Sequence, residues 1–215
     1  MQFRTDFFDE VLCRAFERAR FPRTNPSVIS VTEVTQCLRY SYFMRKMPKC
    51  AHQVVPLLLG IEGHKLVAEY LQEEGFITER LVCRNKDGIR ICGRVDAYHP
   101  DENIIVEVKF VESPPEEVYE DHEFQTQIYL GLIGAKMAYV VYYSRDPTRR
   151  TRVFRVYPSE RAVESAFARA QILHQSLIND FPPPAEKGRW CKWCQYRFDC
   201  YKLSGKTKPK ARSLI

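Results

Sequence analysis

The stretch GRVDAYHPDENIIVEVKF, residues 93–110, decides the fold expected for this chain. Two strand-like segments flank the sequence HPDEN, whose proline, aspartate and asparagine favour a turn. If His99 pairs with Ile104 across that turn, the segments form an antiparallel hairpin, whose register a bulge or another turn would shift by one residue. Side chains alternate between the two faces of a strand, and the apolar residues of each segment share one face. We therefore expect each strand to have a core face and a polar face.

Three polar residues of this hairpin form a candidate catalytic cluster. In the expected register Asp96 lies directly opposite Glu107, with Cβ atoms about 4.5–5.5 Å apart. Two like charges at that separation are unfavourable unless a cation joins them, and a hard divalent ion with oxygen ligands would do so. Lys109 lies on the same face and is placed to orient a water or to bind a phosphate oxygen. This combination suits hydrolysis of a phosphodiester assisted by Mg²⁺ or Mn²⁺.

Outward from this hairpin, helical and strand-like patterns alternate along the chain. Asp87-Gly88 is a strong hairpin-turn signal, and Gly75 ends an amphipathic helix. Ser30 or Thr32 is expected to cap the helix that follows it. The order of the segments predicts an α/β fold with a central mixed sheet flanked by helices. Helices are expected at 7–20, 31–46, 56–75, within 113–135 and at 159–180, and strands at 77–84, 89–98, 104–110, 136–144 and 151–158.

Composition limits the class of protein. The chain has 215 residues, 45% of them hydrophobic and 28% charged, which suits one globular domain with its own core. No apolar run approaches the roughly 20 residues needed to span a bilayer, and the first residues carry acids instead of a signal-peptide core. We therefore expect a cytoplasmic protein without a membrane partner. The formal net charge of +6 is compatible with a polyanionic partner.

Eight cysteines in a chain expected in the cytoplasm favour metal binding over disulfides. Cys191, Cys194 and Cys200 lie close together in CKWCQYRFDC, and a C-x-x-C pair can direct two thiolates at one metal. A fourth thiolate must then come from far along the chain, with Cys37 as our choice and Cys50 as its main rival. Zinc is the general expectation for such a site. The other cysteines are expected to act as small apolar side chains: Cys13, Cys83 and Cys92.

The segment GRVDAY followed by IIVEVK resembles the PD-(D/E)xK nuclease superfamily, and in particular its RecB-like branch. The resemblance implies a restriction-endonuclease-like core in which Asp96, Glu107 and Lys109 are catalytic. In that branch the histidine of a helical G-x-x-x-H motif is a further metal ligand, and GIEGH ends in His64. Val95 stands where the superfamily name has proline, at a position where RecB-like members commonly vary.

The RecB-like branch also carries a Q-x-x-x-Y motif on the helix after the E-x-K strand, and this chain has QTQIY at 125–129. Gln125 and Tyr129 share one helix face because they are four residues apart. The resemblance implies that both line the site and contact the DNA backbone or the catalytic lysine.

The chain has one distant cysteine before these motifs and the pattern C-x-x-C-x-x-x-x-x-C after them. This arrangement resembles that of the iron–sulfur nucleases. These include AddB subunits of bacterial recombination complexes and the CRISPR-associated RecB-like exonucleases, the Cas-four family. The small size of the chain and its lack of helicase motifs favour the Cas-four family. The resemblance implies single-stranded DNA ends as substrate, a role in CRISPR spacer acquisition and antiviral defence, and CRISPR integrase proteins as partners. It also implies a cluster, 4Fe–4S more often than 2Fe–2S, with four ligands: Cys37, Cys191, Cys194 and Cys200.

We expect one nuclease domain over residues 1–215. A cluster between its two ends would stabilise it by several kcal/mol, by analogy with a disulfide that closes a long loop. The expected parts are an N-terminal helical part with one cluster ligand at 28–56, the nuclease core at 57–180, the cysteine clasp at 181–204 and a basic tail at 205–215.

Three runs mix aromatic and cationic residues, LRYSYFMRK, WCKWCQYRF and YYSRDPTRR. Such runs can stack bases and bind phosphates, although aromatic residues beside a cluster often shield it from water. We interpret the chain as a metal-dependent DNA exonuclease. The alternatives are a non-catalytic DNA-binding or scaffold module with zinc or iron–sulfur, an AddB-like recombination nuclease and a small redox protein. The arginines in these runs considered for DNA contact are Arg39, Arg145, Arg149 and Arg150.

Overall fold

The computed structural model describes residues 11, 13–14, 24–49, 54–146 and 148–203. The predicted helix at 7–20 lies largely outside the described residues, and the basic tail lies wholly outside them. Within the described part of the chain, no helix combines the length and the apolar character needed to cross a bilayer. The helices are α2 (Val31–Thr35), α3 (Leu38–Lys46), α4 (Val54–Glu73), α5 (Glu120–Ile133), α6 (Ala162–Ile178), the 3-10 helix η1 (Arg189–Lys192) and α7 (Arg197–Leu203). The strands are β1 (Val28–Ser30), β2 (Ile77–Lys86), β3 (Ile89–His99), β4 (Ile104–Val111), β5 (Met137–Ser144) and β6 (Arg152–Val156).

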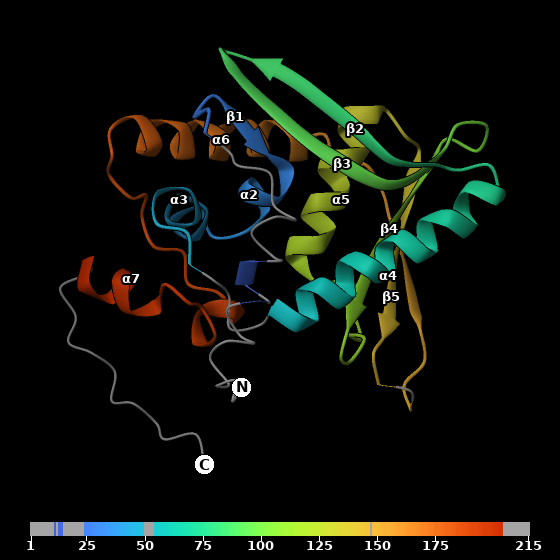
Figure 1. The fold of residues 1–215 in the computed structure, drawn as a ribbon. Helices are drawn as coiled ribbons and strands as arrows, with labels where there is room; N and C mark the ends of the chain where they lie inside the picture. Colours follow the sequence, from blue (N-terminus) through green and yellow to red (C-terminus); the bar gives the residue numbers. More distant parts are fainter. Residues whose placement is uncertain (1–10, 12, 15–23, 50–53, 147, 204–215) are drawn as a thin grey trace.

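The strands form one six-stranded mixed sheet in the order β1-β3-β4-β5-β6, with β2 paired to β3 outside this path. The pairs β1–β3 and β4–β5 are parallel, and the other neighbours are antiparallel. Helix α4 covers one face of the sheet, while α2, α5 and α6 cover the other, with α3 packed on α6 (Figure 1). The predicted mixed sheet flanked by helices is therefore confirmed.

The turn between β3 and β4 has the predicted register, with His99 paired to Ile104. Regular pairing between these strands ends at Ala97 and Val106, one step before Asp96. Beyond that point β4 continues beside β5, and β3 pairs with β1 instead. Asp96 therefore lies where the two strands separate. The predicted pairing of Asp96 with Glu107 is not part of the sheet.

The prediction of one core face and one polar face per strand is wrong for β4. Ile105 lies in the main core on the α5 side, while Val106 and Val108 pack beneath α4, so helices cover both faces. Because side chains alternate, Glu107 and Lys109 project from the same face as Ile105. Glu107 is only 1% exposed. The strand thus carries a carboxylate into the protein interior, where a charge requires compensation.

The predicted helix at 31–46 is broken into two helices at Gln36 and Cys37. Cys37 is the N-cap of α3 and is not inside a helix, so its predicted placement is wrong. Ser30 caps α2 as expected and forms a capping box with Glu33. The strand β1 just before it was not predicted, because three residues carry no readable alternation. It brings the first three residues of the part at 28–56, expected to be helical as a whole, into the sheet.

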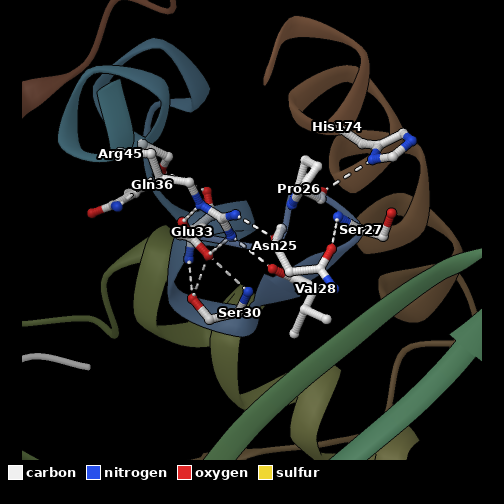
Figure 2. A network of polar contacts seen from close by, with 10 residues as sticks. Asn25, Pro26, Ser27, Val28, Ser30, Glu33, Gln36, Arg45 and His174 are labelled. Atoms are coloured by element: carbon white, nitrogen blue, oxygen red, sulfur yellow. Dashed lines mark hydrogen bonds and ion pairs between the residues drawn. The ribbon is translucent and has the colours of Figure 1, made fainter. Parts of the chain in front are cut away.

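A buried ion pair ties α2 to α3 and to the chain before them (Figure 2). Arg45 Nε lies 2.6 Å from Glu33 Oε1, and the two side chains are only 6% and 4% exposed. Arg45 also donates to the carbonyl oxygens of Val28 at 2.7 Å and Asn25 at 2.9 Å. Glu33 Oε2 accepts from the Ser30 N–H at 2.8 Å. These bonds satisfy both charges, as a buried pair requires, and they fix the direction of α3 and of the cysteine at its start.

Cys83 and Cys92 form a disulfide, which corrects the expectation that both are free. They are directly opposed in the β2–β3 pairing, with Cα atoms 4.2 Å apart. The signal for this pair was present in the sequence. Asp87 and Gly88 both have positive φ and form the predicted two-residue turn, which fixes the register of the hairpin and sets the two cysteines opposite each other.

Candidate active site

Asp96 is held against the backbone of β4 at the point where β3 leaves it. Its Oδ2 accepts a hydrogen bond from the Val108 N–H at 2.7 Å. This bond replaces the next rung of the ladder and keeps the carboxylate close to β4. The charge of Asp96 then acts on Glu107, whose pKa it helps to raise. The two carboxylates are therefore electrostatic neighbours, as the sequence predicted, although the regular strand pairing stops short of them.

Glu107 and Lys109 form an ion pair inside the protein, with Nζ 2.6 Å from Oε1. Burial, and next the charge of Asp96, raise the pKa of Glu107 to about 7, although Lys109 opposes the shift. Burial alone would lower the pKa of Lys109, but the charges of Glu107 and Asp96 outweigh it and raise that pKa. The amine thus stays an ammonium. Glu107 Oε2 is buried and has no hydrogen-bond partner among the described residues.

His64 reaches the same place from α4, on the opposite face of the sheet. Its Nδ1 lies 3.4 Å from Asp96 Oδ1. Burial opposes protonation of His64, but the hydrogen bond and charge of Asp96 outweigh it and raise its pKa. Close packing of α4 on β4 makes this reach possible, because a Cβ at Gly63 would lie 2.7 Å from the ring of Phe110. The structure therefore brings the predicted histidine to the acidic pair.

Gln125 and Tyr129 approach Lys109 from one face of α5. Lys109 Nζ donates to Gln125 Oε1 at 3.1 Å, and Gln125 Nε2 lies 3.5 Å from the Tyr129 hydroxyl. Tyr129 is 2% exposed and packs on Gly93, where an added Cβ would lie 2.5 Å from the tyrosine ring. Only glycine fits at the start of the GRVD segment for this reason. The expected contact with the lysine is present for Gln125, and contact of either residue with DNA stays a prediction.

The donors gathered here suit a hard divalent cation such as Mg²⁺ or Mn²⁺. They are two carboxylates and an imidazole, and one buried oxygen, Glu107 Oε2, is unsatisfied within the described residues. A cation would relieve the repulsion from Asp96 that helps to raise the pKa of Glu107. In the described ranges, no three histidine, cysteine, aspartate or glutamate side chains are already arranged to hold a metal ion. The residue types fit such an ion, with His64, Asp96 and Glu107 as donors, and its binding stays a prediction.

A second group of donors lies at the C-terminal end of the described chain. Burial raises the pKa of Cys194, and the charges of Cys37, Cys191 and Cys200 add to the rise, so these three thiols lie within electrostatic range of Cys194. Gly188 N donates to Cys191 Sγ at 3.4 Å, and Arg39 Nη1 donates to Cys200 Sγ at 3.5 Å. Cys50, the rival fourth ligand, lies outside the described residues. Four cysteines of the described part form no disulfide: Cys37, Cys191, Cys194 and Cys200.

Glu186 anchors the cysteine segment to the rest of the fold. Its Oε2 accepts from the Leu38 N–H at 2.8 Å, and its Oε1 lies 2.5 Å from Arg169 Nη1. Arg39 Nε donates to the carbonyl oxygen of Pro183 at 2.7 Å. These bonds hold the segment after α6 against the start of α3. They also engage Arg39, one of the arginines considered for DNA contact, within the protein itself.

A model of the PD-(D/E)XK nuclease superfamily matches residues 4–201. The chain belongs to this superfamily. The match extends from near the first residue to just past Cys200, so it includes both groups of donors. No curated protein matches the chain.

Solved structures share this nuclease fold. The crystal structure of SSO0001 has a TM-score of 0.70 and 23% identity, covering 93% of this chain and 96% of that one. The alkaline exonuclease LHK-Exo from Laribacter hongkongensis has a TM-score of 0.51 and 13% identity, covering 80% of this chain and 93% of that one. Its complex with dAMP has a TM-score of 0.50 and 14% identity, covering 71% and 88%. At these identities the similarity shows the fold.

The sequence did not indicate that the cysteine segment would contact this nuclease site. Arg189 Nη2 lies 2.5 Å from Asp121 Oδ1, and Trp190 Nε1 donates to Asp121 Oδ2 at 3.3 Å. Asp121 lies one helical turn before Gln125, and its charge is one of those that raise the pKa of Lys109. The four-residue spacing of Asp121 and Gln125 could have indicated that Asp121 lies on the same face of α5 as Gln125. Nothing in the sequence indicated that Arg189 and Trp190 would contact Asp121, because the path of the linker after α6 cannot be predicted from its residues.

His122, in the first turn of α5, lies close to the same site in a neutral state. Its Nδ1 is 2.8 Å from the Tyr142 hydroxyl. That hydroxyl accepts a hydrogen bond from the Tyr119 N–H at 3.2 Å, so its own proton is available to the imidazole. Burial, and next the charge of Lys109, lower the pKa of His122 to about 3. The ring is therefore uncharged in the folded protein at neutral pH.

This histidine is expected to make the protein acid-sensitive. Its pKa falls on folding, so the unfolded chain takes up the proton first, and stability present above about pH 6.5 is lost as the pH falls toward 3. The contribution to the slope is about 1.4 kcal/mol per pH unit. We expect the unfolding free energy of His122→Gln, from urea titrations between about pH 6 and 4, to depend less steeply on pH than that of the wild type. Parallel curves would contradict this assignment.

Proposed function

We propose that this chain is a divalent-metal-dependent DNA exonuclease, which hydrolyses phosphodiester bonds at DNA ends. The observation that carries the proposal is the unsatisfied buried oxygen of Glu107, beside Asp96 and the ammonium of Lys109. A buried carboxylate beside the charge of a second carboxylate is unfavourable unless a cation joins them. Membership of a nuclease superfamily supports hydrolysis of nucleic acid, and the similarity to an alkaline exonuclease supports attack at ends.

The residues divide the chemistry among them. His64, Asp96 and Glu107 would hold Mg²⁺ or Mn²⁺, which supplies charge that polarises the phosphate and lowers the pKa of water. Lys109 presents an ammonium to the phosphate oxygen on which negative charge grows during the reaction. Gln125 accepts a hydrogen bond from that ammonium and so sets its direction. Because these groups are fixed by packing before substrate arrives, little reorganisation is needed during the reaction.

We also infer that Cys37, Cys191, Cys194 and Cys200 hold an iron–sulfur cluster, 4Fe–4S in preference to 2Fe–2S. The support is their common neighbourhood, together with the C-x-x-C spacing that such clusters use. The cluster would join the N-terminal part at 28–56 and the clasp at 181–204 to the nuclease core at 57–180. In this arrangement it stabilises the fold, since it links segments that are far apart in the chain. Nothing in the proposed hydrolysis requires it to change oxidation state.

The substrate and setting follow from the resemblance to the Cas-four family. We infer that the enzyme acts on single-stranded DNA ends, in the processing of DNA for CRISPR spacer acquisition, with CRISPR integrase proteins as partners. The similarity to SSO0001 extends over almost the whole of both chains, which supports a common architecture. The alkaline exonuclease was crystallised with dAMP, a nucleotide of DNA, which supports DNA as the substrate.

The test is digestion of end-labelled single- and double-stranded DNA with and without Mn²⁺, by wild type and Asp96→Asn. Asparagine keeps an oxygen that can accept the Val108 N–H, so this variant retains the local fold and loses only the charge. We expect the wild type to shorten single strands progressively from one end, only with Mn²⁺. The variant should release no product. The labelled end also reports the direction of cutting.

Three results would change the assignment. Equal digestion by Asp96→Asn and wild type would remove the proposed mechanism. Cleavage of closed circular DNA as fast as of linear DNA would indicate an endonuclease. DNA binding with Mg²⁺ present but without any product would favour a non-catalytic binding or scaffold module.

A further inference from the structure

Trp190 and Trp193 are the two tryptophans of the chain, and both lie on the surface of the cysteine segment. They are 55% and 57% exposed, with ring centroids 6.1 Å apart. Leaving such large apolar surfaces in water is unfavourable. Rings that served only to shield the thiols would be packed over them and largely buried. The pair is therefore available to a ligand.

Two cations lie against these rings. Lys192 Nζ is 3.8 Å from the centroid of Trp193, and the guanidinium of Arg189 is 4.8 Å from that of Trp190. The same guanidinium is 3.5 Å from the ring centroid of Tyr119. Attraction between cations and aromatic rings holds both charges at the surface of the rings. These five residues, called here the tryptophan platform, combine aromatic faces with positive charge.

Helix α5 connects the tryptophan platform to the active site. Arg189 and Trp190 both bind Asp121, the second residue of that helix. Asp121 and Gln125 are four residues apart, so they share a face and are separated by about 6 Å along the axis. Gln125 Oε1 in turn lies 3.1 Å from Lys109 Nζ. Arg189 and Trp190 are thus attached to the same face of α5 that contacts the Lys109 ammonium.

We propose that the tryptophan platform stacks the unpaired bases of single-stranded DNA and directs the strand end toward Lys109. Unpaired bases offer the flat faces that indole rings bind, and the phosphates between them complement Lys192, while Arg189 is held by Asp121. In a duplex the bases already stack on one another, so only the phosphates would interact. The platform therefore selects for single strands. This inference deepens the proposed function, and the binding that it describes is measurable without cleavage.

The test is binding of a labelled oligothymidylate to the anaerobically purified full chain, by fluorescence anisotropy without Mg²⁺ or Mn²⁺. Trp190→Ala and Trp193→Ala should each weaken binding by about ten-fold, and the double variant should weaken it further. The matched control is Tyr157→Ala, which removes an aromatic side chain that is 59% exposed and outside the platform, and should bind as the wild type does. Equal thermal unfolding and visible absorbance would show that the variants are intact.

A second probe separates stacking from charge. An oligonucleotide whose sugars lack bases keeps its phosphates but has nothing to stack. The wild type should bind it about as weakly as the double tryptophan variant binds oligothymidylate, and that variant should not distinguish the two probes. Since the chain has no other tryptophan, oligothymidylate should also quench the wild-type tryptophan fluorescence, and the probe without bases should not.

The outcomes separate this inference from the proposed function. Unchanged affinity in the double variant, or equal binding of both probes by the wild type, would overturn the tryptophan platform even if the protein cuts DNA. Weakened binding by the variants, together with a wild type that cuts no DNA with Mn²⁺, would refute the nuclease and leave the platform in place.

Discussion

Replacing Lys109 with methionine is expected to reduce DNA cleavage by about 10²–10³-fold or more, the usual loss when one group that stabilises transition-state charge is removed. Methionine keeps the unbranched apolar chain that fills the space beside α5, and it removes the ammonium. Glu107 loses the cation 2.6 Å from its Oε1, so less stabilisation remains for its charge. Rates of product release from end-labelled single-stranded DNA, at saturating Mn²⁺, measure the effect.

The control for this variant is Lys136→Met. Lys136 lies 3.7 Å from Glu102 and its side chain is 56% exposed, so removing its charge should leave cleavage near the wild-type rate. Circular dichroism spectra should be the same for all three proteins. A Lys109→Met protein that cuts DNA at a rate comparable to the wild type would show that the ammonium does not act in the reaction.

Replacing Cys37 with serine is expected to abolish the visible absorbance of the anaerobically purified protein and to lower its stability. The cluster would no longer join α3 to the segment after α6. By the estimate for disulfides that close loops of comparable length, the loss is about 4–5 kcal/mol in the free energy of unfolding. Absorbance spectra, iron analysis and urea unfolding measure the two effects.

Cys50→Ser distinguishes the two candidate ligands in the N-terminal part. If the Cys37 variant keeps its colour and its iron while Cys50→Ser loses both, the fourth ligand has been assigned to the wrong residue. Bound zinc in place of iron in the wild type would show that the four thiols hold the metal expected from their number alone. Cys92→Ser serves as the control, because it opens the β2–β3 disulfide without removing any of the four thiols.

The parts of the structure that were predicted correctly depend on short stretches of chain. The pairing of His99 with Ile104 follows from the turn residues between them and from strand alternation. Gly75 and the pair Asp87-Gly88 occur where the backbone takes positive φ, which is why they end a helix and form a turn. In each case the cause lies within a few residues of the effect.

The predictions that failed depend on elements that pack from elsewhere in the chain. Glu107 is buried because α5 covers its face of β4, and no pattern within IIVEVKF distinguishes that from an exposed polar face. The helical pattern of the sequence continues through Cys37, but the helix is interrupted there. The carboxylate of Glu186 accepts a hydrogen bond from the backbone N–H of Leu38, at the start of α3. The contact of Arg189 with Asp121 likewise depends on the path of the linker after α6.

Because β3 separates from β4 at Asp96, the site cannot form from this hairpin alone. The groups assigned to hydrolysis come from α4, β3, β4 and α5, and they meet only after the sheet and both of its covering layers have assembled. A nascent chain still emerging from the ribosome, or a proteolytic fragment missing any one of these elements, would carry the same amino acids without a working centre. The arrangement of donors is therefore complete only when the whole fold has formed.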